Sequence, residues 1–365
     1  MPWPLPRAIH WCHEFLWPGD LAEEAAKSAL AEYHKEFDVV KLHEAVDYYR
    51  QAVDQRRRRN HRLLASTLAG YADAVWTQYM RRKDEPDDLE NAVALGREAL
   101  DIWPTEKSTQ QYVDILYLVA SAYFETYERS TRLRTVRIVG NVDAYDLAFH
   151  YFTELKDRAV GGNLTRTVQI RLGALIAMRC DFGETTDRLE SGLQYLTDVL
   201  AGLSESEMAD KGGKRREIED VQAMCFYNLA TLYECRSEWL KGHGDHSKLQ
   251  DISMAIDYSV KARVLLERLH RSELPLCTFR LARQLWRRWR KTGNQTDFAD
   301  AKVMARAAMT GASEDFDGLL CNMVDVLLQV LSPTSRPGSL TSSYDSEFLE
   351  SDGTSSVSLL PLLLE

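Results

Sequence analysis

Residues 68–79 read LAGYADAVWTQY, and residues 116–127 read LYLVASAYFETY. The two stretches lie 48 residues apart and share a leucine, two alanines and a tyrosine at the same four positions. In the first stretch, Leu68, Ala72, Val75 and Tyr79 follow one another at intervals of three or four residues, the spacing of one face of an α-helix. A helical pattern that returns at a fixed interval predicts a stacked array, in which each unit buries its apolar face against its neighbours.

A second helical signature alternates with these stretches along the chain. Leu-x-x-Ala-Val occurs at residues 42–46 and 89–93, and weaker copies begin at Tyr145, Leu189 and Ile252. Small side chains at a helix contact allow two helix axes to approach closely. We name the first helix of each pair helix A and the second helix B. The predicted fold is all-α, an α-solenoid of about six antiparallel helix pairs with a capping helix at its end.

The connections between the paired helices carry boundary residues. Asp38 and Asp297 lie where N-caps are expected, because Asp accepts hydrogen bonds from the first free backbone N–H groups of a helix. Gly293 lies four residues before Asp297, as expected for a turn between paired helices.

The pattern divides the chain into four parts. Residues 1–18 are expected to form an irregular N-terminal leader, and residues 19–310 the helical array. Residues 311–331 fit one more helix that caps the stack, since terminal units of an array need a polar outer face. Residues 332–365 are rich in serine and lose the periodicity, so we expect a disordered tail.

The array resembles the tetratricopeptide repeat. Residues 229–233 (LATLY) with Ala255, and residues 119–123 (VASAY) with Ala148, carry the resemblance best. It covers roughly residues 19–310 and implies a superhelix whose A helices line a concave groove for a partner protein or peptide.

The repeats depart from that family in length. The separation between Ala72 and Ala92 is about eight residues longer than usual, and the closing proline is mostly absent, with Pro104 the exception. The longer period is similar to arrays in fungal proteins that precede a caspase-like CHAT domain. No such domain follows here, so the protease role of that group is not expected.

Composition excludes several classes of protein. The net charge of −10 argues against nucleic-acid binding by bulk attraction. Six cysteines without a CxxC motif favour free thiols in a reducing compartment, and we expect a cytoplasmic protein. The N-terminus lacks the apolar run of a signal peptide, and no segment is long enough to span a membrane.

No catalytic or cofactor motif occurs in the chain. GxSxG, HExxH, the phosphate loop and the dinucleotide fingerprint are all missing. His10, Cys12 and His13 lie together without a second ligand group at suitable spacing, which favours chance over a metal site. We therefore expect a protein that is not an enzyme and binds no cofactor or metal.

Arginines form two basic segments. Residues 56–59 could bind phosphate or an acidic partner, but a solvated loop after a helix is the favoured interpretation. Arg280, Arg283, Arg287 and Arg290 form a stripe on one face of a predicted A helix. This stripe could bind an acidic or C-terminal peptide. The favoured alternative is a solvent-exposed helix face that binds no ligand.

By the alignment of the A helices, several aromatic and charged residues share the positions that would face the groove. Aromatic rings supply apolar anchors at interfaces, and arginine can bind carboxylates with two hydrogen bonds. The candidates for the partner groove are Asp73, Trp76, Tyr117, Phe124, Tyr227, Arg283, Trp286 and Arg287.

The predicted function is that of a non-catalytic protein–protein interaction scaffold. Its partner would be a protein or peptide, an acidic one being suited to the arginine stripe, and the oligomeric state stays open. One alternative is a nucleic-acid-binding array that uses the arginine stripes, with affinity falling steeply with salt. Others are an enzyme whose residues come from distant helices, and a fragment of a larger signalling protein.

Overall fold

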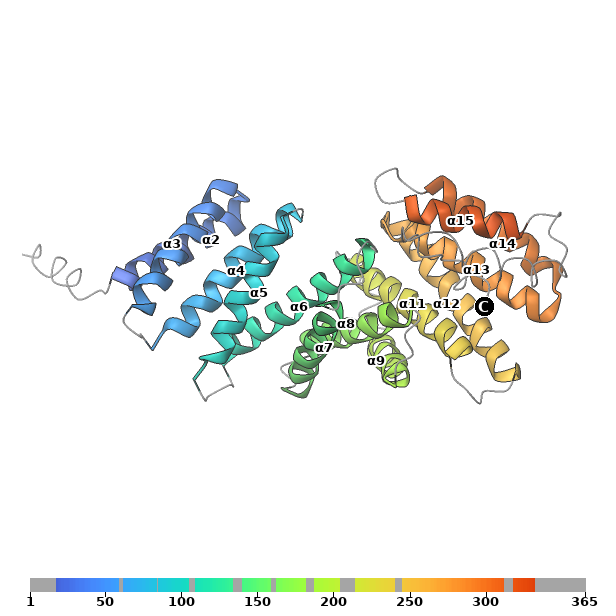
Figure 1. Ribbon diagram of the computed structural model, residues 1–365, viewed down its shortest axis with the longest axis horizontal. Coiled ribbons are helices and arrows are strands. Elements are labelled where there is room, and N and C mark those ends of the chain that lie inside the picture. Colours follow the sequence, from blue (N-terminus) through green and yellow to red (C-terminus); the bar gives the residue numbers. More distant parts are fainter. Residues whose placement is uncertain are drawn as a thin grey trace, which may run out of the picture. The chain divides into compact units, whose positions relative to one another are not determined.

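The computed structural model describes residues 18–58, 62–83, 85–104, 109–133, 140–158, 162–181, 187–203, 214–239, 245–311 and 318–331. Within these ranges the chain forms helices and their connections, without strands (Figure 1). The helices are α2 (Pro18–Glu36), α3 (Val39–Arg57), α4 (Leu64–Arg82), α5 (Pro86–Asp101), α6 (Gln110–Leu133), α7 (Gly140–Arg158), α8 (Gly162–Asp181), α9 (Leu189–Ala201), α11 (Lys214–Trp239), α12 (Asp245–Leu269), α13 (Leu274–Thr292), α14 (Gln295–Gly311) and α15 (Gly318–Val330).

The predicted fold class is confirmed: the chain is an all-α solenoid of consecutive helix pairs. The A helices are α2, α4, α6, α8, α11 and α13, and each is followed by its B helix, with α15 as the last helix described. The predicted leader lies outside the described residues except for Pro18, which begins α2. The predicted tail, residues 332–365, also lies outside the described residues.

The chain divides into two compact units, and the boundary falls inside α8. The first unit runs from Met1 to Val168. In its described part, α2 and α3, α4 and α5, and α6 and α7 form three hairpins. The B helices α3 and α5 also contact the next A helices, α4 and α6, and α4 contacts both α2 and α6. The A helices of this unit therefore lie side by side.

The second unit runs from Gln169 to Glu365. Its hairpins include α11 with α12 and α13 with α14, and α9 packs against α11. The last helix, α15, contacts both α13 and α14. Val324, Leu327 and Leu331, on α15 and just after it, join the hydrophobic cluster that α13 and α14 form. The apolar side of α14 is thus covered by the final helix.

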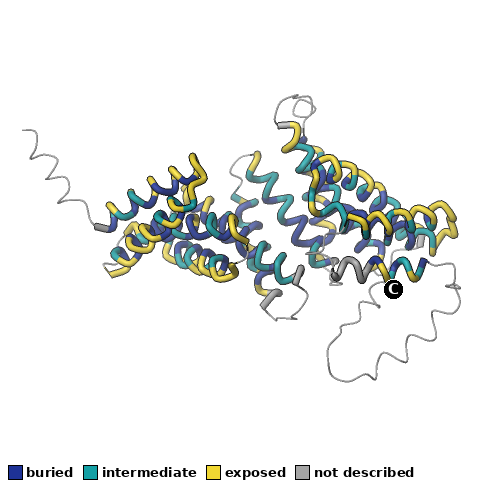
Figure 2. The backbone as a smooth tube through the Cα atoms, turned by 90° about the horizontal axis from the view of Figure 1, so that it is seen from above, coloured by how far each residue is buried: buried dark blue, intermediate teal, exposed yellow. Residues whose placement is uncertain are grey.

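Small residues lie at the closest helix contacts, as the repeat pattern predicted. Ala72 and Ala120 are 0% exposed, and Ala230 is 2% exposed. Buried residues lie where neighbouring helices meet, and exposed residues lie on the opposite sides (Figure 2). An array of this kind is held together mainly by apolar area removed from water at each hairpin interface.

The predicted helix boundaries were right in two cases and wrong in one. Asp38 caps α3, because its carboxylate accepts a hydrogen bond of 2.9 Å from the N–H of Val40. Gly293 ends α13 with a φ of 72°, a left-handed conformation that favours glycine. Asp297 is not an N-cap: α14 already begins at Gln295, and the side chain of Asn294 accepts the hydrogen bond from the N–H of Thr296.

The close approach of helices predicts how one substitution will act. A Cβ atom added at Gly96 on α5 would lie 2.5 Å from Cγ2 of the fully buried Val119 on α6. Alanine usually stabilises a helix relative to glycine by about 1 kcal/mol, but here the helices must move apart. We expect Gly96→Ala to lower the free energy of unfolding by about 1–2 kcal/mol, measured by urea denaturation.

The control for this prediction is Gly162→Ala, at the first residue of α8, where an added Cβ meets nothing within 4 Å. This variant should be as stable as the natural chain or slightly more stable. Equal stability of the two variants would contradict the close-approach argument.

Candidate partner-binding face

The structure places the eight candidate residues on four A helices and in both units. Asp73 and Trp76 lie on α4, and Tyr117 and Phe124 on α6, all in the first unit. The other four belong to the second unit: Tyr227 on α11, and Arg283, Trp286 and Arg287 on α13. Each unit is therefore considered by itself.

In the first unit the candidates differ in exposure. Asp73 is exposed, Trp76 and Tyr117 are half-buried, and Phe124 is only 5% exposed. The rings of Tyr117 and Phe124 both meet the ring of Phe152 edge to face, at 6.3 and 6.4 Å between centroids. Phe124 thus belongs to the core, whereas Trp76 and Tyr117 keep part of their rings at the surface.

The carboxylate of Asp73 is accessible to water and yet crowded by protein. Partial loss of water raises the pKa of Asp73 above its usual value, His34 on α2 opposes this rise, and Asp114 on α6 adds to it. In the part of the chain that the structure describes, Asp73 makes no hydrogen bond or ion pair. Among the described residues its negative charge is therefore not directly paired, although His34 lies near enough to act on it.

In the second unit, a buried carboxylate holds two of the candidate arginines. Nε of Arg283 lies 2.8 Å from Oε1 of Glu234 on α11, and Nη1 of Arg287 lies 2.5 Å from the same oxygen. Arg287 also pairs with Glu238. The side-chain amide of Gln284 donates a hydrogen bond of 3.0 Å to the other oxygen of Glu234.

A third arginine of α13 is bound in a similar way. Arg280 is buried, donates a hydrogen bond of 2.5 Å to Oγ1 of Thr231, and lies over the ring of Tyr227 with 4.5 Å to its centroid. Trp286 is 3% exposed and belongs to the hydrophobic core of this unit. The predicted stripe is thus largely turned toward α11.

Glu234 is the residue that sequence reasoning missed. It occupies the same repeat position as Trp76, Phe124 and Trp286, counted from the buried alanine four residues earlier. Burial alone would raise the pKa of Glu234, but the positive charges and hydrogen bonds of Arg283 and Arg287 outweigh it, and the pKa is lowered. A carboxylate at a position otherwise held by aromatic rings was the available sign of an internal ion pair.

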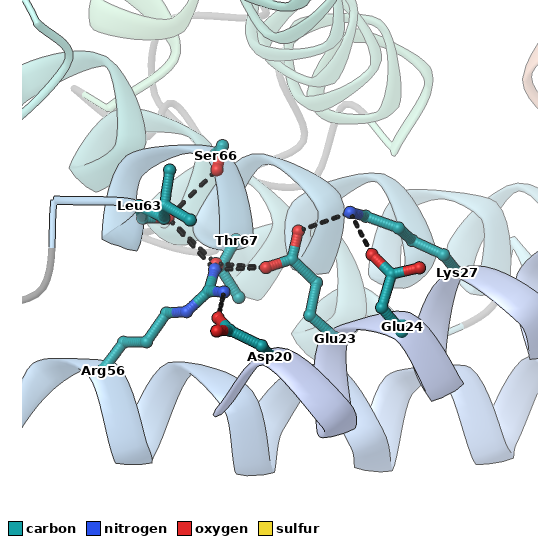
Figure 3. A network of polar contacts seen from close by, with 8 residues as sticks. All are labelled: Asp20, Glu23, Glu24, Lys27, Arg56, Leu63, Ser66 and Thr67. Carbon is teal, nitrogen blue, oxygen red and sulfur yellow. Dashed lines mark hydrogen bonds and ion pairs between the residues drawn. The ribbon is translucent and has the colours of Figure 1, made fainter. Parts of the chain in front are cut away.

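The first basic segment is also part of the structure, and its interpretation as a solvated loop was wrong for Arg56. Figure 3 shows the Arg56 guanidinium between Asp20 and Glu23 of α2 and Thr67 of α4. Oγ1 of Thr67 in turn donates a hydrogen bond of 3.0 Å to Glu23. Arg57 pairs with Glu98 on α5, with 3.1 Å from Nε to Oε1. These cations join neighbouring helices.

The described residues contain no group of three or more His, Cys, Asp or Glu side chains that could hold a metal ion. The predicted chance cluster of His10, Cys12 and His13 lies outside them. Among the helices described, none has a stretch long and apolar enough to cross a membrane.

Comparison with known proteins adds little to this description. No family model and no curated protein matches the chain. Among solved structures, the chain is similar to a "Circular tandem repeat protein with novel repeat topology and enhanced subunit contact surfaces". The identity is 16% and the TM-score 0.30, over 86% of this chain and 75% of that chain. The fold assignment therefore rests on the helices and contacts described above.

The buried carboxylate gives a prediction about stability. Glu234→Gln leaves Arg283 and Arg287 without their shared counter-charge, so we expect a loss on the order of 3 kcal/mol in the free energy of unfolding at pH 7. The folded-state pKa lies below the usual 4.5, so the carboxylate stabilises fully at neutral pH. The difference between variant and natural chain should shrink as the pH falls below about 4.5.

Glu238→Gln is the matched control. Glu238 forms an ion pair with Arg287 but not with Arg283, and its side chain is 30% exposed. Its loss should be clearly smaller. Equal losses for the two variants in pH-dependent denaturation would refute a special role of Glu234.

Asp73 gives the opposite prediction. Because its pKa is raised on folding, the ionised carboxylate destabilises the folded state at neutral pH. We expect Asp73→Asn to raise the free energy of unfolding at pH 7 slightly, by less than about 1 kcal/mol. The gain should vanish as the pH falls below 3.8, where the carboxylate is protonated in both states.

Asp47→Asn removes an equally negative residue from the first unit and serves as the control. Asp47 is well exposed and pairs with Arg50 at 3.2 Å, so its replacement should bring no gain. A loss of stability on Asp73→Asn, measured by thermal and urea denaturation, would show that the carboxylate supports the fold.

Proposed function

We propose that this chain is a non-catalytic scaffold that binds a partner protein or peptide on the face of its A helices, as tetratricopeptide arrays do. The all-α solenoid supports a general role in protein interaction. Four buried cysteines form no disulfide: Cys180, Cys225, Cys235 and Cys277. Buried thiols of this kind support a reducing compartment, and we propose the cytoplasm.

The observation that carries this proposal is the state of α4 and α6. Both helices pack against a B helix on each side and against each other. Even so, Asp73 is exposed and Trp76 and Tyr117 keep part of their rings at the surface. Partly exposed aromatic rings beside a charged group are typical of the residues that dominate binding energy at interfaces.

The candidates do not all contribute in the same way under this proposal. Phe124 and Trp286 are buried and would support the face from below rather than touch a partner. Arg283 and Arg287 already bind Glu234, so an acidic partner would have to compete with an internal carboxylate. We therefore propose the first unit as the primary site, with Tyr227 and the two arginines as secondary candidates.

The nucleic-acid alternative is less well supported. Its phosphate contacts would come from the arginine stripes, and arginines bound to internal carboxylates are not available to release counterions from a phosphate backbone. Arg56, Arg283 and Arg287 are each bound to Asp or Glu side chains of the chain itself. The net charge of −10 points the same way.

Affinity capture on the full chain tests the proposal. The natural chain is used to capture proteins from a nuclease-treated native extract. When Tyr117→Ser removes the ring from the face, the amount of each captured protein should fall by about tenfold or more in quantitative mass spectrometry. Tyr48→Ser is the matched control, because Tyr48 is a surface tyrosine 37% exposed on helix B of the same unit. Thermal denaturation should first show that both variants are folded.

Two outcomes would count against the proposal. The natural chain retaining no protein would contradict a scaffold role. Proteins that bind equally to both variants would place the interaction away from the A-helix face.

A further inference from the structure

We propose that the α4–α6 face of the first unit binds a cationic side chain of its partner, an arginine or lysine of a basic segment, at Asp73. This inference rests on the proposed function and specifies the chemistry of the partner. It is opposite in sign to the acidic peptide that the arginine stripe of α13 suggested.

In the second unit, the corresponding positions are bound by side chains of the chain itself. With the buried alanines Ala72, Ala120, Ala230 and Ala282 aligned, α4 and α6 in the first unit correspond to α11 and α13 in the second. Three arginines of α13 reach back to α11. Their partners are Thr231, Glu234 and the ring of Tyr227.

The first unit lacks those arginines. The residues of α6 that correspond to Arg280, Arg283 and Arg287 are Leu118, Ser121 and Glu125. Across from them, α4 carries Asp73, which corresponds to Thr231. The face therefore has a carboxylate at the position to which a guanidinium donates in the second unit, and no arginine of α6 to meet it.

Two groups on this face are left without hydrogen-bond partners. Asp73 makes no hydrogen bond or ion pair in the described chain, although protein atoms crowd it. His34 on α2 acts on it as a positive charge from a distance, and Asp114 adds a second negative charge nearby. Ser121 is 7% exposed, and its Oγ, in the position of the Arg283 side chain, has no hydrogen-bond partner among the described residues. Both groups accept hydrogen bonds, so both call for an N–H donor.

Three other carboxylates of this unit are bound by side chains of the chain itself. Glu98 is bound by Arg57, and Glu154 by Arg158 at 2.6 Å. Glu125 accepts a hydrogen bond of 3.1 Å from the hydroxyl of Tyr79. Unpaired charge in a partly desolvated place is costly, which makes an external cation the complementary group.

Two aromatic rings on the same two helices suit the same ligand. Trp76 is one turn along α4, and Tyr117 is one turn before Ser121 on α6, both partly at the surface. Arginine and lysine bind to aromatic faces through their charge and cover them with their aliphatic stems. In the second unit, Arg280 lies over the ring of Tyr227, so the chain contains one arginine–tyrosine contact of this kind. Tyr227 has the repeat position of Tyr117, although its counterpart on α4 is Ala69.

The test uses a random 16-residue phage-displayed peptide library selected on the full chain. The selected peptides should be enriched in arginine and lysine. A synthetic copy of the best peptide, titrated by fluorescence anisotropy at pH 7.5, should bind Asp73→Asn about tenfold more weakly than the natural chain. It should bind Asp47→Asn, which loses the same charge from α3, within about twofold.

A charge exchange makes the assignment residue-specific. Asp73→Arg should abolish binding of the basic peptide, and a peptide with its critical arginine replaced by glutamate should regain affinity for Asp73→Arg alone. Such a rescue is not expected from a purely structural role of Asp73.

The outcomes separate this inference from the proposed function. Peptides without basic residues, or binding that tolerates Asp73→Asn, would overturn the cationic site, while the captured proteins would still support a scaffold. A library that yields no binder would also overturn the cationic site. If, in addition, the natural chain captured no protein from the extract, the scaffold proposal itself would be refuted.

Discussion

The close approach of helices at buried small residues is the constraint on which the rest of the structure depends. Ala72 and Ala120 are fully enclosed, and Gly96 has no room for even one further carbon beside Val119. Because the hairpins must nest at this distance, successive A helices come to lie next to each other. Residues at the same repeat position then fall near one another in space. The chemistry of the face follows from that spacing.

The two units fill equivalent positions in different ways. On α11 and α13 the interior is polar: Glu234 with Arg283 and Arg287, and Gln284 with a hydrogen bond of 2.7 Å from Ser259. A buried ionic cluster adds little net stability over apolar packing, but it penalises any shift of one helix along the other. On α6 the positions of the three arginines are held by Leu118, Ser121 and Glu125. Equivalent positions thus carry internal ion pairs in one unit, and in the other they leave Asp73 exposed and Trp76 half-buried.

The sequence predicted the fold well but did not predict which charged side chains bind one another, for one physical reason. Helix pairing depends on local periodicity, which is visible within a single repeat, and even the weak fourth pair, α8 and α9, formed where expected. Charge pairing depends on residues far apart in the chain. Arg283 binds Glu234, which is 49 residues away, and Arg56 binds Asp20, 36 residues away, so neither contact shows in a motif. Asp297 has the sequence position of a cap, but its carboxylate accepts a hydrogen bond of 2.8 Å from Arg288 on the preceding helix. That partner was not visible in the local sequence.

The contacts of Arg56 with Asp20, Glu23 and Thr67 affect how the surrounding helices can separate. A linear stack has few contacts at its ends, so fraying normally begins at a terminal hairpin and spreads inward. Here one enclosed guanidinium is bonded to α2 and to α4 from its place on α3. Separating α2 from α3 and α4 would leave that charge without its two carboxylates, so these three helices are expected to separate only together.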